Sequence, residues 1–193
     1  MKYFFSYHPQ TYKEKILYLT FDDGPEPNIT EFIIDLLKKY DAKATFFCCG
    51  NNCLKYSSLV NLIRLNKHKI GNHTDNHLNG LKSPVKKYIE DVYKCNQICQ
   101  TELFRPPWGV INLREYFYLR INYKIILWDV VSGDTNKKLA NLSYYKQYWS
   151  KNISSNSIIL FHFSTEHEKN TRILLPYFLE IYSKLGYKFE SII

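Results

Sequence analysis

Two adjacent carboxylates stand where a short apolar run of the chain ends. Asp22 and Asp23 follow the run Ile16 to Phe21 and precede Gly24 and Pro25. Successive side chains of a strand point to opposite faces, so both carboxylates can serve one site only if the strand ends where they begin. Gly-Pro is a strong turn signal that supplies such an ending. The pair is a candidate for one acid–base or metal site, whereas an isolated Asp-Asp-Gly is more often a solvated turn.

Two histidines are separated by three intervening residues in the run His73-Thr74-Asp75-Asn76-His77. In a helical turn or a tight loop this spacing brings two imidazoles to one side, which suits two ligands of one divalent ion. A carboxylate from elsewhere would complete a site of two histidines and one carboxylate. Two histidines without a common ligand in a polar loop are the competing interpretation, and this motif alone does not decide between them.

A third motif places a cation before a rigid turn. Arg105 comes directly after the apolar pair Leu103 and Phe104 and precedes Pro106-Pro107-Trp108-Gly109. An arginine fixed in this way can orient a carboxylate and hold its pKa down. An ordinary surface ion pair is the alternative.

His162 lies within one of the most apolar runs of the chain, Ile158 to Phe163. A lone histidine on a buried strand is more often a satisfied core residue than a catalyst. Near the end of its strand, however, a neighbouring carboxylate could raise its pKa and keep it protonated as an acid. Asp129 and Asp134 are the candidate carboxylates.

Short β-rich runs alternate with amphipathic segments, and these elements must position the four motifs. The patterns predict strands over 16–21, 44–48, 69–73, 103–104, 124–130, 157–163 and 187–192. They predict helices over 29–40, with Asn28 and Glu31 as a capping box, and over 54–65, 84–101, 112–120, 142–152 and 171–185. Strict alternation favours an α/β fold with a parallel sheet, open or closed as a barrel, whose sites lie at the carboxyl ends of its strands.

Composition indicates one globular domain covering residues 1–193, because 45% of the 193 residues are hydrophobic and no linker or repeat interrupts them. The net charge of +8 permits attraction to polyanions. Its lysines are scattered through the predicted helices, so we expect a solvated surface and no nucleic-acid partner.

The first ten residues contain no apolar region long enough for a signal peptide, and no later run approaches the length of a transmembrane segment. As it stands, the sequence predicts a cytoplasmic protein and leaves export open.

Five cysteines, an odd number with two adjacent, do not resemble a secreted disulfide framework: Cys48, Cys49, Cys53, Cys95 and Cys99. Two Cys-x-x-x-Cys spacings could form a zinc site. However, the second pair lies on a predicted helix, and neither spacing is the tight Cys-x-x-Cys of a zinc knuckle. We therefore expect reduced, structural thiols.

These motifs, in this order, resemble the NodB-type polysaccharide deacetylases, carbohydrate esterase family four. Residues 20–25 match the first family motif residue for residue, 73–77 match the second, 105–108 the third and 160–162 the fifth. The fourth motif, Asp-x-x-Asp-Trp, fits worst: aligned on 131–135 it keeps Asp134 but has Val131 and Thr135 at its ends. Trp108 stands where the third motif usually has Tyr. The departures put the family's usual substrates in doubt more than its reaction.

The resemblance implies a single-domain distorted (β/α) barrel with about seven parallel strands. It also implies roles for the matching residues. Asp22 would be the base, and Asp23, His73 and His77 would bind the metal. Arg105 would position the base, His162 would be the acid, and Asp134 would tune the pKa of that acid. A backbone N–H of the Arg105 turn, that of Trp108, would hold the oxyanion.

The activity implied is removal of the N-acetyl group from N-acetylglucosamine units of an oligo- or polysaccharide, such as a chitooligosaccharide, with release of acetate. One divalent metal ion is expected, Zn²⁺ first, with Co²⁺ or Ni²⁺ as alternatives. A related metal hydrolase of a non-sugar amide or C–N bond, and a catalytically inactive carbohydrate-binding relative, remain the competing functions.

Overall fold

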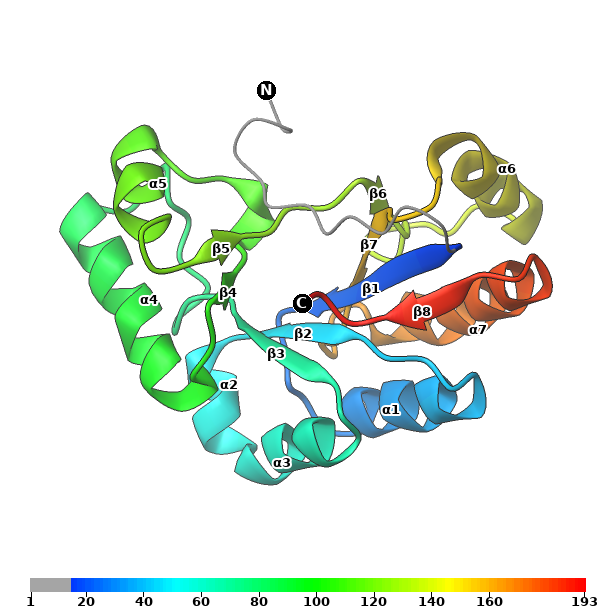
Figure 1. The fold of residues 1–193 in the computed structure, drawn as a ribbon, viewed down its shortest axis with the longest axis horizontal. Helices are drawn as coiled ribbons and strands as arrows, with labels where there is room; N and C mark the ends of the chain where they lie inside the picture. Colours follow the sequence, from blue (N-terminus) through cyan, green and yellow to red (C-terminus); the bar gives the residue numbers. More distant parts are fainter. Residues whose placement is uncertain (1–14) are drawn as a thin grey trace.

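A curled parallel sheet forms the centre of the molecule and takes the shape of a half-barrel (Figure 1). The structure, a computed structural model, describes residues 15–193. Seven strands follow the order β5-β4-β3-β2-β1-β7-β6, and β8 pairs with the beginning of β1. The strands are β1 (Ile16–Asp22), β2 (Thr45–Cys48), β3 (Lys69–Asn72), β4 (Leu103–Phe104), β5 (Lys124–Ile125), β6 (Val130–Val131), β7 (Ile158–His162) and β8 (Lys188–Glu190).

Helices cover the outer face of this sheet (Figure 1). They are α1 (Ile29–Lys39), α2 (Gly50–Lys55), α3 (Ser57–Leu65), α4 (Val85–Cys99), α5 (Leu113–Leu119), α6 (Leu142–Asn152) and α7 (Glu168–Lys184), with a 3₁₀ turn η2 at Pro107–Gly109. The predicted α/β fold with a curled sheet of about seven parallel strands is confirmed. The assignment of residues 1–193 to a single domain stays a prediction.

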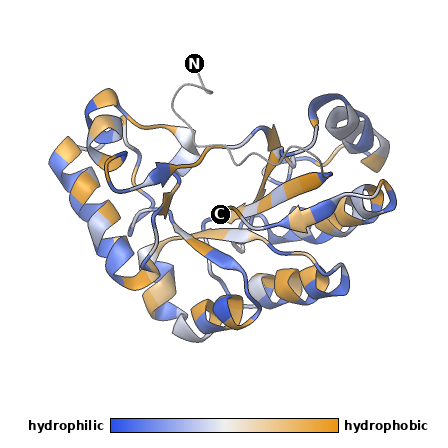
Figure 2. Cartoon of the chain, in the orientation of Figure 1, coloured by the Kyte–Doolittle hydropathy of each residue, from blue (hydrophilic) through white to orange (hydrophobic). Residues whose placement is uncertain are grey.

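The central strand β1 is buried on both faces, which is why its sequence reads as a continuous apolar run. Leu17, Leu19 and Phe21 pack into the large cluster beneath the helices. Ile16 and Tyr18 point into the half-barrel. Figure 2 shows the resulting band of hydrophobic residues along the strands. By the same alternation, the residues at 20 and 22 share the inner face, so the strand delivers its carboxylate to the interior.

The predicted strand over 124–130 is wrong in its middle, because two short strands at opposite edges of the half-barrel replace it. β5 pairs with β4, and β6 pairs with β7. Between them, the carbonyls of Ile126 and Leu127 accept hydrogen bonds from the guanidinium of Arg105. The chain thus leaves the sheet at the two residues whose carbonyls bind the buried Arg105.

Two further expectations about helices also fail. The helix predicted over 54–65 is the pair α2 and α3, which meet at Tyr56 with φ −124° and ψ 50°. Asn28 does not cap α1 with its side chain, because its φ of 67° turns the backbone away from the usual N-cap conformation. Instead, the hydroxyl of Thr30 accepts a hydrogen bond from the N–H of Glu26.

The five cysteines are free and buried, and the sulfurs of Cys95 and Cys99 lie 3.6 Å apart. No helix within residues 15–193 is both long enough and apolar enough to cross a bilayer. Residues 1–10, on which the expectation about a signal peptide rests, lie outside the described part.

Replacement of Phe46 by Ala tests the packing of the sheet. Phe46 is fully buried, and its ring stacks on Phe21 at 5.0 Å. We expect Phe46→Ala to lower the free energy of unfolding by about 3–5 kcal/mol because it leaves a cavity. The matched control Phe117→Ala removes a ring on α5 that is 55% exposed. It should change the free energy of unfolding by less than about 0.5 kcal/mol. Urea unfolding followed by circular dichroism measures both, and equal midpoints would contradict the packing described here.

Candidate active site

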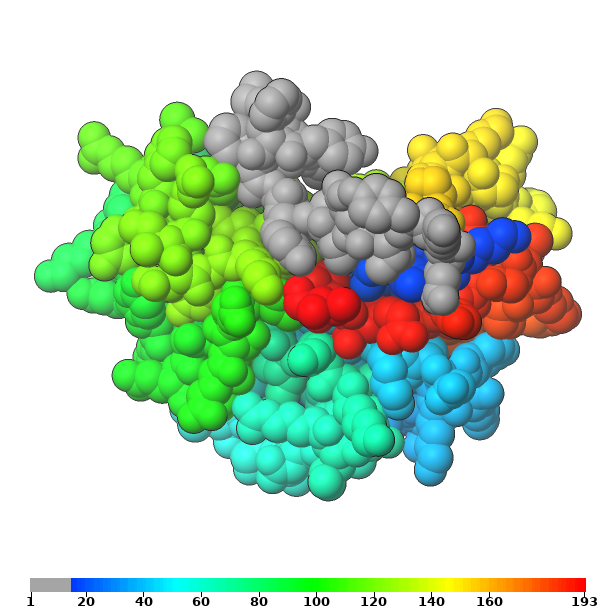
Figure 3. Space-filling view, viewed as in Figure 1, coloured from blue at the N-terminus to red at the C-terminus, as the bar shows by residue number. Residues whose placement is uncertain are grey.

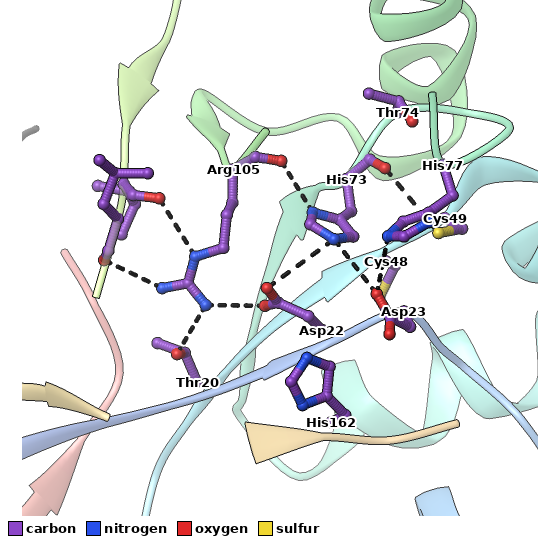
Figure 4. Close-up of polar contacts among 12 residues, drawn as sticks. Thr20, Asp22, Asp23, Cys48, Cys49, His73, Thr74, His77, Arg105 and His162 are labelled. Atoms are coloured by element: carbon purple, nitrogen blue, oxygen red, sulfur yellow. Dashed lines mark hydrogen bonds and ion pairs between the residues drawn. The ribbon is translucent and has the colours of Figure 1, made fainter. Parts of the chain in front are cut away.

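The predicted site residues meet at the carboxyl ends of four strands (Figure 4). Asp22 is the last residue of β1, and His162, the last residue of β7, is its register partner in the sheet. His73 follows β3, and Arg105 follows β4. Parallel pairing therefore gathers residues far apart in the sequence at one edge of the sheet, as expected for this architecture.

Arg105 holds the carboxylate of Asp22 inside the half-barrel. Its Nη1 lies 2.7 Å from Asp22 Oδ1 and 2.8 Å from the hydroxyl oxygen of Thr20. Both charged side chains are at least 96% buried. The guanidinium also lies 4.2 Å from the ring centre of Phe47. This pair is a buried, fixed ion pair, and the alternative of a surface ion pair is wrong.

The site also uses a threonine that our sequence analysis did not assign. Thr20 lies two residues before Asp22 and therefore on the same face of β1. Its hydroxyl accepts from Arg105 and donates to the carbonyl of Ile159 on β7. Strand periodicity could have pointed to it, since a polar residue two positions before a buried carboxylate shares its environment.

A left-handed turn brings the second carboxylate to the same side as the first. β1 ends at Asp22, and Asp23 has φ 85°. This turn rotates the Asp23 side chain out of the strand alternation, so that its Oδ1 lies 3.3 Å from His73 Nε2 and 3.1 Å from His77 Nε2. The strand ending expected from Gly24 and Pro25 thus begins one residue earlier, at Asp23 itself.

Asp23, His73 and His77 could hold one metal ion. Within residues 15–193, their three ligand atoms form a group in which all lie within 4.8 Å of one another. His73 Nδ1 lies 2.8 Å from the carbonyl oxygen of Arg105, and because a carbonyl only accepts, this nitrogen carries the proton. In the neutral ring the Nε2 lone pair then faces the Asp23 carboxylate. Two acceptors at this distance need a cation between them, and a metal ion fits the donor set.

The pKa of Asp23 reflects the same neighbours. Burial alone would raise the pKa of this carboxyl, but when the two imidazoles are protonated, their hydrogen bonds and positive charge lower it far below its ordinary value. Asp23 is therefore ionised at neutral pH, as a metal ligand must be.

His162 is paired with Asp134, which decides between the two candidate carboxylates. The Nδ1 of His162 lies 3.1 Å from Asp134 Oδ1, and its backbone N–H donates to Asp134 Oδ2 at 2.6 Å. Asp129 instead accepts from the backbone N–H of Ile158. Burial alone would lower the pKa of His162. The hydrogen bond and charge of Asp134, with the charges of Asp23 and Asp22, raise the pKa of His162 to about 9.

A second threonine missed in the sequence supports this pair from α7. The hydroxyl of Thr171 lies 3.1 Å from Asp134 Oδ2 and 3.2 Å from the carbonyl oxygen of His162. Asp134 is 1% exposed, so its carboxylate depends on these partners for its hydrogen bonds. Nothing local in the sequence around residue 171 indicates this role, because the contact arises only when α7 packs against the end of β7.

Trp108 borders the site as a largely exposed ring. It has φ 55° in η2, and its ring centre lies 4.2 Å from that of His77. A cavity of about 410 Å³ is lined by residues that include Asp23, His77 and Ser164. The positions that depart from the fourth motif, Val131 and Thr135, are exposed. The site therefore has room for a ligand beside the predicted metal ligands.

Comparison with known proteins adds an independent line of evidence. Residues 10–119 match the family model described as polysaccharide deacetylase. A peptidoglycan-N-acetylglucosamine deacetylase of Bacillus cereus is 32% identical over 185 residues, which cover 93% of this chain and 87% of that protein. A chitooligosaccharide deacetylase of Azorhizobium caulinodans is 36% identical over 106 residues, 51% of this chain and 50% of that protein.

The fold has a close counterpart among solved structures. The crystal structure of the peptidoglycan N-acetylglucosamine deacetylase Bc1960, in complex with a hydroxamate-type benzamide, aligns with a TM-score of 0.86. The alignment covers 96% of this chain and 88% of that one, at 28% sequence identity. The half-barrel described above is therefore shared over nearly the whole of both chains.

Replacement of Asp134 by Asn tests the electrostatics around His162. The amide keeps the shape of the carboxylate and removes its charge, so the pKa of His162 should fall from about 9 toward or below its ordinary 6.5. NMR titration of the imidazole resonances in chelator-treated protein measures this change. Asp129→Asn is the matched control and should leave the His162 titration in place. An unchanged titration in Asp134→Asn would contradict the pairing.

Proposed function

The chain belongs to the polysaccharide deacetylase family, and from this premise we propose that it is a metal-dependent N-deacetylase. Its substrate would be an oligo- or polysaccharide that contains N-acetylglucosamine, and its products acetate and a free amino sugar. The observation that carries the proposal is the convergence of Asp23, His73 and His77 on one point beside the buried carboxylate of Asp22.

A divalent ion held by Asp23, His73 and His77 would lower the pKa of a water to about 7 and polarise the acetamide carbonyl. Zn²⁺ suits the two imidazoles and one carboxylate, and Co²⁺ or Ni²⁺ would accept the same ligands. The donor set fits, because the His73 tautomer already directs a lone pair to the position between the rings and Asp23.

Asp22 is placed to remove a proton from the attacking water. Its Oδ2 lies 3.8 Å from His73 Nε2, which puts it next to the ligand group without making it a member of that group. Arg105 fixes the carboxylate in position through Oδ1 and leaves Oδ2 as the proton acceptor. A base held by a buried cation needs little reorganisation when the proton moves.

His162 is placed to protonate the departing amine. It borders Asp22 in the sheet register, and Asp134 holds the proton on Nδ1 so that the opposite ring nitrogen faces the site. With a pKa of about 9, the ring is protonated at neutral pH and can act as an acid. The water oxygen becomes an oxygen of the acetic acid that forms as the C–N bond breaks. Asp22 takes one proton from the water, and His162 gives one proton to the amine nitrogen. Asp22 then loses its proton to solvent and His162 regains one from solvent, so the step balances and both groups return to their starting states.

Two features of Trp108 support the proposal. The backbone N–H of Trp108 lies in a left-handed turn at the edge of the site, where it would donate to the oxyanion. The Trp108 ring, 56% exposed, offers a flat face on which a sugar ring can stack. A related amide hydrolase or an inactive carbohydrate-binding protein could share this fold, but neither would release acetate from N-acetylglucosamine oligomers.

Acetate release from N-acetylglucosamine oligomers tests the activity. We expect chelator-treated protein to release none and added Zn²⁺ or Co²⁺ to restore release, because the attacking water needs a Lewis acid. Small aliphatic acetamides serve as the comparison substrate. If protein that binds one metal ion stoichiometrically releases no acetate from the oligomers, the deacetylase proposal is wrong, and turnover of the small amides would favour the alternative hydrolase.

Two variants separate the base from the metal ligands. Asp22→Asn should lower kcat by at least about 10²-fold yet retain metal affinity, because the amide cannot accept the proton and does not belong to the ligand group. His73→Ala should lose both activity and metal affinity. Metal competition assays and acetate release are measured on each variant. Equal loss of metal in both would overturn the assignment of roles.

A further inference from the structure

The loop that carries both histidines has a backbone that ordinary residues adopt at a cost. Thr74 has φ 63° and His77 has φ 53°, both in the left-handed region. Residues other than glycine rarely adopt this region, and they persist there only where the surroundings fix them. The loop joins β3 to the segment before α4, so its middle lies outside both the sheet and the helix. Other parts of the protein must therefore hold it in place.

Asp91, in the second turn of α4, accepts three of the hydrogen bonds that hold this loop. Its Oδ2 accepts hydrogen bonds from the backbone N–H groups of Asp75 at 2.8 Å and of Asn76 at 2.9 Å. Its Oδ1 accepts from the side-chain amide of Asn76 at 2.5 Å. Asp91 is 7% exposed. One buried carboxylate thus binds three donors from two of the three residues between the histidines, and hydrogen bonds to an ionised acceptor are about twice as strong as neutral ones.

We propose that Asp91 is a positioning residue for the metal site: its carboxylate fixes the loop 73–77 so that His73 and His77 face Asp23. This inference rests on the proposed function, because it assigns a role in holding the metal ligands. Asp91 lies outside the group of ligand atoms, so it acts through the loop. Groups that orient metal ligands typically contribute about 10–100-fold in metal affinity.

Neighbouring contacts show that the loop is held from both sides. Lys94, three residues after Asp91 on α4, lies 2.6 Å from Asp75 Oδ2. On α2, the side-chain amide of Asn51 donates to Asn76 Oδ1 at 2.5 Å. The Asp91 side chain differs from those of Lys94 and Asn51 because it is buried and accepts hydrogen bonds from backbone N–H groups of the loop. The Lys94 side chain is 56% exposed, so solvent screens its pair with the buried Asp75, whereas a buried acceptor of two backbone N–H groups directly fixes the backbone of the loop.

The first experiment measures Co²⁺ binding in the absence of any substrate. Co²⁺ affinity is obtained by competition with a chelator, and the visible absorption of bound Co²⁺ reports the ligand geometry. In Asp91→Asn, an amide group lies opposite the amide of Asn76, and the negative charge is lost. We expect about 10–100-fold weaker Co²⁺ binding and an altered spectrum. The matched control is Glu90→Gln, the exposed neighbour on the same helix, which should bind Co²⁺ as the unmodified protein does.

A charge exchange separates positioning from general destabilisation. Asn76→Asp alone puts two carboxylates together and should weaken Co²⁺ binding as Asp91→Asn does. In the double variant Asp91→Asn with Asn76→Asp, donor and acceptor are exchanged between the two positions, and the carbonyl oxygen at position 91 can still accept from the backbone. The double variant should recover part of the lost affinity and the original spectrum. If Asp91→Asn only destabilised α4, the losses of Co²⁺ affinity in the two single variants would add in the double variant.

The outcomes separate this inference from the proposed function. Wild-type affinity and spectrum in Asp91→Asn, or a double variant whose losses add, would overturn the role of Asp91. Weakened Co²⁺ binding in Asp91→Asn that the exchange partly restores supports it, whether or not the protein releases acetate. Absence of acetate release from fully metal-loaded wild-type protein would instead count against the proposed deacetylase alone.

Discussion

The arrangement of the site depends on one buried charge, the guanidinium of Arg105. A cation taken out of water costs several kcal/mol, which an opposite charge and well-formed hydrogen bonds can offset. Arg105 meets this requirement with partners from separate parts of the chain: a carboxylate and a hydroxyl on β1 and two carbonyls at Ile126 and Leu127. The gap between β5 and β6 is part of the same solution, because a continuous ladder would occupy those carbonyls. The electrostatic requirement and the interruption of the sheet are therefore linked.

Several of the site residues lie in the turns that follow the strands, and these turns orient their side chains. Asp23, Thr74, His77 and Trp108 all have positive φ, and all stand within one or a few residues of a strand end. Each such conformation has a cost that the surrounding structure offsets. A sheet buried on both faces provides a rigid frame for this purpose, since its packed strands leave the turns few alternative positions.

Much of this could be predicted from the sequence, for reasons visible in particular residues. Asp22, Asp23, His73, His77, Arg105 and His162 occur in local motifs at strand ends, and parallel pairing then brings them together. The choice of Asp134 over Asp129 could not be made from the residues alone, because both lie close to the end of the same predicted strand. Thr171 and the broken strand at 126–129 escaped prediction since their partners lie far away in the sequence. Helix and strand propensities describe neighbours along the chain and carry no information about such contacts.

The pairing of β1 has a consequence for the stage of synthesis at which the protein can fold. This strand lies next to β2 near the amino end of the chain, but its other neighbours, β7 and β8, come more than a hundred residues later (Figure 1; Figure 3). While a ribosome is still producing the middle of the chain, β1 has one open edge and an apolar face without its cover. Contacts this distant in sequence slow folding and prolong exposure of such edges. Synthesis of the last third would then complete the core and bring His162 beside Asp22 in a single event, so a nascent chain would gain its acid and its stability together.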